Sequence, residues 1–162
     1  MLVIHRDGSG LKYSPLMDVY SDDIKAAAEA EYPRLPFHEA LFQAEQDFYA
    51  YMTRVFFQKE KTFCAVWENY HAALRMEPYE DGYLLTGLTT APSARRKGYA
   101  SMLLGQTLQT LPAGTKIYSH VDKSNAPSVA FHEKFGFQKE LSYARMLNGE
   151  LLHNFWTFSY RN

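Results

Sequence analysis

Residues 92–104 read PSARRKGYASMLL, three cations and one glycine followed by an apolar run with helical spacing. The segment just before it, residues 83–90 (YLLTGLTT), has the composition of a strand, so the two together predict a strand–turn–helix junction. A helix start presents unpaired backbone N–H groups and the positive end of its dipole, and a glycine there lets a ligand approach the main chain. The combination predicts an anion site, most often one for phosphate. The alternative is an ordinary helix N-terminus whose arginines are solvated.

The rest of the chain alternates between strand and helix signals. Short apolar and β-branched runs bounded by turn residues predict strands at 2–6, 62–68, 71–77, 83–90, 116–121, 141–147 and 151–160. Helices are predicted at 15–32, in a second segment with Leu41, Phe48, Met52 and Val55 on one face, after the glycine of the opening stretch, and at 128–135. Asn148–Gly149 is a favoured hairpin turn between the last two strands. The order β-α-α-β-β-β-α-β-α-β-β predicts an α/β (α+β) fold with a mixed, mostly antiparallel, twisted sheet flanked by helices.

Composition restricts the partners. The formal net charge is −1, so neither a nucleic acid nor an acidic membrane is expected to bind. The only cysteine, Cys64, excludes an intrachain disulfide and is expected to be a small apolar strand residue. The histidines His5, His38, His71 and His153 share no ligand spacing, so no metal site is expected. There is no membrane-length apolar run and no signal-peptide pattern, which predicts a reduced, cytoplasmic protein.

A second informative stretch, residues 125–137, reads NAPSVAFHEKFGF. Taken with RRKGYA at 95–100, it resembles the GNAT superfamily of acyl-CoA-dependent N-acyltransferases. In the first stretch, Arg95, Gly98 and Ala100 hold the defining positions of the family's [Q/R]-x-x-G-x-[G/A] phosphate loop. The second stretch fits the family's N-x-x-A/S…Y-E-K-x-G-F pattern through Asn125, Ser128, Glu133, Lys134, Gly136 and Phe137. One helix and one strand separate the two motifs, as in the family.

The resemblance implies a single acyl-CoA N-acyltransferase domain over residues 1–162, with residues 83–137 as the coenzyme A-binding core and residues 1–61 as a variable, acceptor-side half. It implies acetyl-CoA as co-substrate and no metal. The loop would hold the pyrophosphate through backbone N–H groups of Arg96 to Ser101, and the strand before it would pair with the pantetheine. The implied cofactor-binding residues are Leu88, Thr89, Thr90, Arg95, Arg96, Lys97, Gly98, Tyr99, Ala100, Ser101, Asn125 and Ser128. An amide at Leu88 or Thr89 would stabilise the oxyanion, and Asn125 would bond the pantetheine, cap the following helix, or do both.

The implied reaction is direct attack of an amine on the acetyl thioester, which needs a base for the amine's proton. His120 is the candidate base, because it lies near the end of the strand that opens the cleft, on the same face as Tyr118. If that face is the packing side rather than the cleft side, His120 is a core histidine. Glu68, Glu77 and Glu80 are rivals, expected to be solvated. His132 takes the position where many family members have a tyrosine that protonates the thiolate; it is either an acid or a half-exposed helix residue.

Two other functions remain open at this point. A non-catalytic coenzyme A-binding sensor or partner module would keep the fold without turnover, and thiol release across a panel of amines would distinguish it from the enzyme. A different anion-binding α/β domain would require the second motif to be accidental. The sequence does not identify the acceptor beyond a small-molecule or peptide amine. The aromatic strand near the C-terminus, with Phe155, Trp156, Phe158 and Tyr160, is one that can pair or pack across a homodimer.

Overall fold

The strands of the protein, seen in a computed structural model that describes residues 1–162, form one seven-stranded sheet and a separate hairpin. The sheet order is β1-β2-β3-β4-β5-β9-β6. The strands are β1 Leu2–His5, β2 Phe63–Trp67, β3 Ala72–Tyr79, β4 Gly82–Thr90, β5 Lys116–Asp122, β6 Gln138–Leu141, β7 Ala144–Arg145, β8 Leu151–Leu152 and β9 Phe155–Arg161. The β4–β5 pair is parallel, whereas β1–β2, β5–β9 and β6–β9 are antiparallel. The predicted fold class, a mixed and mostly antiparallel sheet flanked by helices, is confirmed.

The five α-helices are α1 Tyr13–Val19, α2 Ser21–Glu31, α3 Phe37–Arg54, α4 Tyr99–Gln109 and α5 Ala126–Phe135. None of them is both long enough and apolar enough to cross a lipid bilayer. The chain divides into two compact units: the first is Met1–Arg75 with Gly87–Gln106, and the second is Met76–Thr86 with Thr107–Asn162. Each unit is described by itself below.

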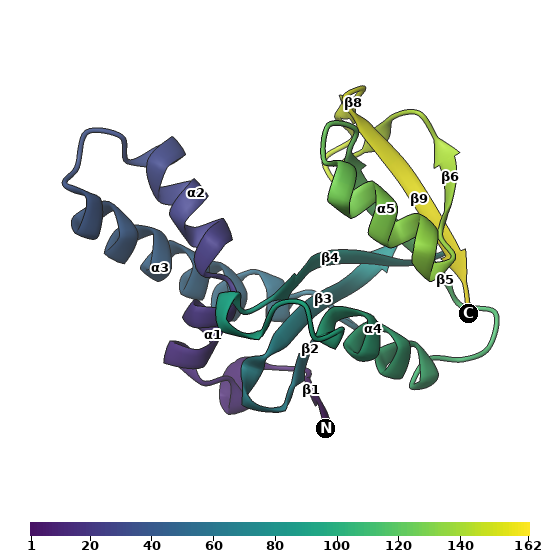
Figure 1. Cartoon of the computed structure of the whole chain (residues 1–162), viewed down its shortest axis with the longest axis horizontal. Coiled ribbons are helices and arrows are strands. Elements are labelled where there is room, and N and C mark those ends of the chain that lie inside the picture. Colours follow the sequence, from purple (N-terminus) through teal and green to yellow (C-terminus); the bar gives the residue numbers. More distant parts are fainter. The chain divides into compact units, whose positions relative to one another are not determined.

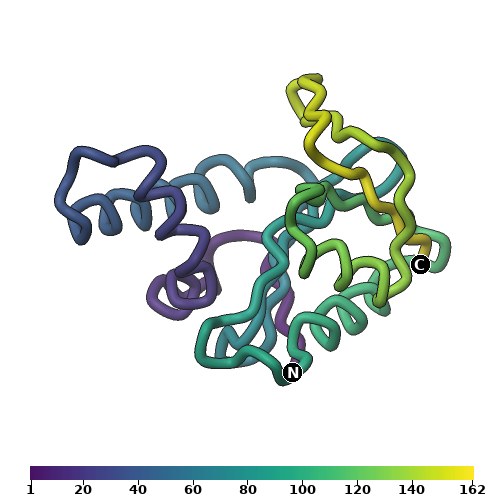
Figure 2. The backbone as a smooth tube through the Cα atoms, turned by 45° about the horizontal axis from the view of Figure 1, so that its top comes forward, coloured from purple at the N-terminus to yellow at the C-terminus, as the bar shows by residue number.

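In the first unit, the helices α1 to α3 cover a core that includes the fully buried Leu16, Met52 and Phe56. Helices α2 and α3 run side by side (Figure 1, Figure 2). Cys64 is buried on β2, as predicted.

Two details of the predicted helices are wrong. The helix predicted over 15–32 is broken at Tyr20, which has a backbone φ of −97° and ψ of 16° between α1 and α2. The tyrosine ring is buried and its hydroxyl bonds to Gly87 on β4, so a tertiary contact overrides the continuous helical signal. Val55, expected on the buried face of the second helix, is 47% exposed because α3 ends at Arg54.

In the second unit, β5 pairs with β9 over its whole length, and α5 covers β5 (Figure 1). Gly136 ends α5 with a φ of 118°, the left-handed cap that its position predicts. The parallel pairing of β4 with β5 covers only Tyr83–Leu85 and Ile117–Ser119. Beyond Ser119, therefore, β5 keeps a partner on one edge only, and His120 lies in that stretch.

The C-terminal strands are shorter than predicted. The segment 141–147 contributes the end of β6 and the two-residue β7, because the pairing with β9 shifts register after Lys139 and the carbonyl of Tyr143 accepts a bond from Thr157 at 2.6 Å instead. The turn at Asn148–Gly149 joins β7 to β8 as expected, with Gly149 at a φ of 89°. β9 lies between β5 and β6, and β6 pairs with Thr157–Ser159 of β9. Over these residues both edges of β9 are paired within the chain.

Candidate functional site

The loop between β4 and α4 has a backbone that only a few residue types adopt easily. A one-turn 3₁₀ helix, Pro92–Ala94, follows β4, and Ala91 donates its N–H to the carbonyl of His71 at 2.8 Å. Arg96 has a φ of 66° and Gly98 a φ of 76°, both in the left-handed region. The first helical bond of α4 runs from the N–H of Met102 to the carbonyl of Gly98 at 3.1 Å. The N–H groups of the three preceding residues, 99–101, therefore have no acceptor within the helix.

The space beside Gly98 is open. A Cβ atom placed on this glycine would have no other atom within 4 Å, and residues 95–98 are all exposed. The first turn of α4 thus offers free N–H groups, the positive end of the helix dipole and an unobstructed approach, which are the requirements for binding phosphate. The predicted residues Arg96 to Ser101 are brought together here.

The three cations of the loop differ in whether they have an acidic partner. The Arg95 guanidinium forms an ion pair with Asp22 on α2, and the two side chains are 50% and 62% exposed. Such an exposed pair contributes at most about 1 kcal/mol. Arg95 is therefore tethered toward α2, whereas the exposed Arg96 and Lys97 remain to attract an anion.

A ring-stacking contact that sequence analysis did not predict holds the start of α4. The imidazole of His71, just before β3, stacks on the ring of Tyr99 with centroids 4.8 Å apart and planes 15° apart. Because His71 also accepts the N–H of Ala91, it fixes both ends of the loop.

Gly87, inside strand β4, has a φ of 59°, in the left-handed region. The hydroxyl of Tyr20 donates to the Gly87 carbonyl at 2.8 Å. The N–H of Leu88 belongs to the same trans peptide unit and therefore points opposite to that carbonyl. Sequence reasoning named the Leu88 and Thr89 amides but missed Gly87 and Tyr20; a glycine inside a strand signal is the clue that was available.

A pocket of about 480 Å³ lies in the second unit. It is lined by Glu77, Leu84, Thr86, His120, Met146, Leu147, Asn148 and Phe155. Four of these side chains are apolar, and the only formally charged one is Glu77. The pocket therefore suits a small, partly apolar molecule.

His120 lines this pocket in a half-buried position. Its Nε2 atom is buried and has no hydrogen-bond partner, and its ring meets the ring of Tyr79 edge to face at 5.3 Å. Tyr118 also contacts Tyr79, which confirms that His120 and Tyr118 share a face of β5. Burial holds the pKa of His120 below its ordinary value of 6.5, so the imidazole is neutral at pH 7.

The three carboxylates considered as alternative bases differ in their burial. Glu77 is only 5% exposed and lines the pocket, so the expectation that it is solvated is wrong. Its position on β3 turns it inward. Glu80 is exposed, and Glu68 is exposed and lies 3.3 Å from the N-terminal amino group.

His132 is 5% exposed, not half-exposed. Its Nδ1 lies 2.7 Å from the carbonyl oxygen of Ser128, which can only accept, so Nδ1 carries the proton. Its Nε2, 2.8 Å from the hydroxyl of Ser119, then accepts from that hydroxyl. Burial lowers the pKa of His132. A neutral imidazole with both nitrogens bonded favours a structural role over proton transfer.

Asn125 caps α5. Its side-chain oxygen accepts the N–H of Ser128 at 3.2 Å, which confirms the capping role and leaves the side-chain NH₂ group for other partners. Of the predicted site residues, 88–101 lie in the first unit, and His120, Asn125, Ser128 and His132 lie in the second.

A family model described as the acetyltransferase (GNAT) family matches residues 20–137, well over half of the chain. The chain belongs to the GNAT acetyltransferase family. The match includes both of the motifs singled out in the sequence, as well as Tyr20 and His120. No curated protein sequence matches the chain significantly.

Solved GNAT structures share the fold. One is the PaiA N-acetyltransferase from Thermoplasma acidophilum in complex with coenzyme A, with a TM-score of 0.58, 12% identity, and 100% of this chain and 99% of that chain covered. A second is the ribosomal-protein-S18-alanine N-acetyltransferase from Escherichia coli, with a TM-score of 0.56, 18% identity, and coverage of 99% and 94%. A third is an N-acetyltransferase from Staphylococcus aureus Mu50, with a TM-score of 0.60, 15% identity, and coverage of 97% and 98%. At these identities the likeness is one of fold.

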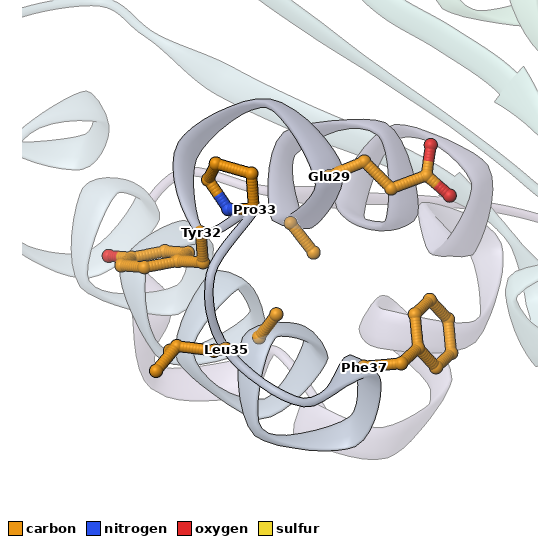
Figure 3. A pocket seen from close by; sticks show the side chains of 7 residues that line it. Glu29, Tyr32, Pro33, Leu35 and Phe37 are labelled. Atoms are coloured by element: carbon orange, nitrogen blue, oxygen red, sulfur yellow. The ribbon is translucent and has the colours of Figure 1, made fainter.

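This GNAT protein has another hollow, of about 250 Å³, between the end of α2 and the start of α3 (Figure 3). It is lined by Ala28, Glu29, Tyr32, Pro33, Leu35, Phe37 and Ala40. Phe37 is 54% exposed at its rim. None of the predicted site residues lines this hollow, so it is kept apart from the candidate site.

Proposed function

We propose that this GNAT protein is an N-acetyltransferase that moves the acetyl group of acetyl-CoA to an amine by direct attack in a ternary complex. The observation that carries the proposal is the loop before α4, where Gly98 leaves open space beside three N–H groups without helical acceptors. Family membership supports the acetyl transfer, and a GNAT structure of the same fold was solved with coenzyme A.

In this proposal the loop binds the pyrophosphate through backbone N–H groups of Arg96 to Ser101, and Arg96 and Lys97 add long-range attraction. The main chain of Leu88 to Thr90 pairs with the pantetheine like an additional strand. Asn125 and Ser128 contribute further polar contacts to the pantetheine, and Asn125 does so through the NH₂ group that capping leaves free. Residues 1–162 act as one acyltransferase domain.

The chemistry follows from what each group can do. The amine nitrogen forms a bond to the acetyl carbon, and the C–S bond breaks with its electron pair leaving on the thiolate. The N–H of Leu88, turned by the Tyr20–Gly87 bond, donates to the oxyanion. The neutral imidazole of His120 receives the proton of the attacking amine. A thiolate is a good leaving group, so water can protonate it; His132 as the acid would first have to give up the bonds to Ser119 and Ser128.

The acceptor in this proposal is a small-molecule or peptide amine that enters the pocket lined by His120 and Glu77. The apolar lining from Met146, Leu147 and Phe155 accommodates its carbon skeleton.

The test is thiol release from acetyl-CoA across a panel of primary amines, together with calorimetry of coenzyme A binding. Amine-dependent thiol release with formation of the N-acetyl product supports the enzyme. Tight coenzyme A binding without release for any amine would support the sensor module instead, and the absence of coenzyme A binding would remove both.

A further inference from the structure

Arg75, on β3 in the first unit, is a half-buried cation without an acidic partner. Its guanidinium carbon lies 5.2 Å from the ring centre of Tyr20, 5.5 Å from Phe48 and 6.0 Å from Tyr51. The only hydrogen-bond acceptor it reaches is the sulfur of Met52, at 3.7 Å, and its Nε atom is buried with no partner at all. A guanidinium has five N–H donors, so protein groups engage only a small part of its hydrogen-bonding capacity.

The nearby acids of the first unit form no ion pair with Arg75. Asp22 is engaged by Arg95. Burial raises the pKa of the Asp23 carboxyl, and the nearby charge of Arg75 partly opposes this rise without an ion pair between the two side chains. The Cys64 thiol, also within its field, has a pKa raised to about 12 by burial and is neutral.

A buried charge is retained only where something compensates it. Aromatic faces offset part of the desolvation, but a planar guanidinium recovers most when it bonds a carboxylate through two parallel N–H groups. Fixed among three rings, the Arg75 side chain is held in place before any ligand arrives, which reduces the entropy cost of binding. A guanidinium held in this way suits a planar anion.

Arg75 lies beside the strand position assigned to the reacting carbonyl rather than beside the phosphate loop. A Cβ atom on Gly87 would lie 2.7 Å from a terminal nitrogen of Arg75, so the guanidinium borders the residue next to Leu88. Leu88 is the residue whose amide is assigned to the reacting carbonyl. The phosphates of coenzyme A are assigned to the loop beyond Thr90, more than about 10 Å along an extended strand.

We propose that Arg75 binds the carboxylate of the amine acceptor, so that the acceptor class is an amino acid or a similar short amino-carboxylate. This inference rests on the proposed acetyl transfer. The carboxylate would lock one end of the acceptor while its amine remains free to attack. Amines that lack a carboxylate would bind weakly.

The test compares each amino acid with its own carboxamide, which has the same side chain and shape but no negative charge. Rates are expressed per concentration of the free-base amine, since the two amines differ in pKa. For the wild type, kcat/KM is expected to favour the acid by about 10- to 100-fold, as for hydrogen bonds to a charged group. Arg75→Met should remove this preference mainly through KM, and Arg75→Lys, which keeps the charge but loses the planar fork, should retain part of it.

Arg54→Met, which removes an exposed arginine at the end of α3, is the matched control and should keep the wild-type preference. Binding of the N-acetylated amino acid, measured by calorimetry, gives a readout that needs no turnover. Loss of that binding in Arg75→Met supports the inference even if no active amine has been found. Equal losses for acid and amide, or unchanged product binding, would overturn it and assign Arg75 to support of the left-handed backbone at Gly87.

Discussion

Two adjacent residues of β5, Ser119 and His120, point to opposite faces of the sheet. Ser119 faces α5 and bonds to the buried His132, whereas His120 faces Tyr79 and the pocket. Strand alternation predicts this difference, and the two histidines consequently differ in availability. His132 has both ring nitrogens bonded, while the Nε2 of His120 has no partner. The base assignment therefore rests on His120.

A pH–rate profile tests His120. The neutral imidazole is the base, so kcat/KM should fall when acid protonates it; because burial lowers its pKa, this limb should lie below pH 6.5. His120→Ala should lose about 10²- to 10⁴-fold in turnover, lose that limb and keep its affinity for coenzyme A. The profile is measured with one amine and expressed per free base, because titration of the amine produces a similar rise.

The exposed His153 of the same unit supplies the control, and His153→Ala should keep the wild-type profile. A wild-type profile in His120→Ala would transfer the base role to water or to Glu77, which lines the same pocket.

At the scale of elements, the phosphate loop depends on two left-handed residues, Arg96 and Gly98. They turn the chain from β4 into α4 so that the first turn of the helix is uncovered. The stacking of His71 on Tyr99 then keeps the helix start in place. Since a Cβ atom on Gly98 would meet no other atom within 4 Å, its lack of a side chain serves backbone conformation and ligand approach rather than packing.

Gly98→Val and Gly114→Val form a matched pair. Both glycines have a positive φ, 76° and 86°, and a Cβ on either would meet no atom within 4 Å. Each substitution should therefore cost a similar strain of about 1–3 kcal/mol in the free energy of unfolding. Only Gly98→Val should also weaken coenzyme A binding, by tenfold or more, because its side chain occupies the approach to the N–H groups.

Urea unfolding measures the strain, and calorimetry measures the affinity. If folded Gly98→Val binds coenzyme A as tightly as folded Gly114→Val, the loop is not the pyrophosphate site.

At the scale of the whole molecule, the sequence predicts what depends on local pattern. The strand and helix order, the caps at Gly136 and Asn125, and the face shared by Tyr118 and His120 all follow from periodicity and turn chemistry. Features set by contacts between distant segments could not be predicted. The break at Tyr20 depends on a bond to Gly87, 67 residues away.

The same reason explains the errors in the candidate site. Glu77 is near a turn in the sequence, yet the pocket encloses it, and the burial of His132 depends on Ser119 from another element. Arg75 gave no motif at all, because its surroundings come from α1–α2, α3 and β4 together. These residues can be recognised as parts of the site only when the tertiary contacts between distant segments are known.

Buried histidines should make the stability of the whole molecule depend on pH. Burial lowers the pKa of both His120 and His132 below 6.5, so the folded protein resists protonating them while the unfolded chain does not. As pH falls through about 6.5, the unfolded state gains protons first, and the free energy of unfolding decreases until the folded pKa is reached. Above that window the contribution is fully present. Each unit of difference between folded and unfolded pKa is worth about 1.4 kcal/mol.

Urea midpoints between pH 5 and 8 measure this dependence, and His132→Asn isolates the part due to His132, since asparagine does not titrate. The variant should be less stable than the wild type at pH 8, because it loses the geometry of the bonds to Ser119 and Ser128, but its midpoint should fall less steeply toward pH 5. His5, whose pKa burial also lowers, remains in both proteins and cancels in the comparison. The carboxyls of Asp7, Asp81 and Asp122 have pKa values lowered below 3.8 and act in a more acidic window. Parallel curves for the two proteins would mean that His132 is protonated as readily in the folded state as in the unfolded one, and the case against its acting as an acid would then fail.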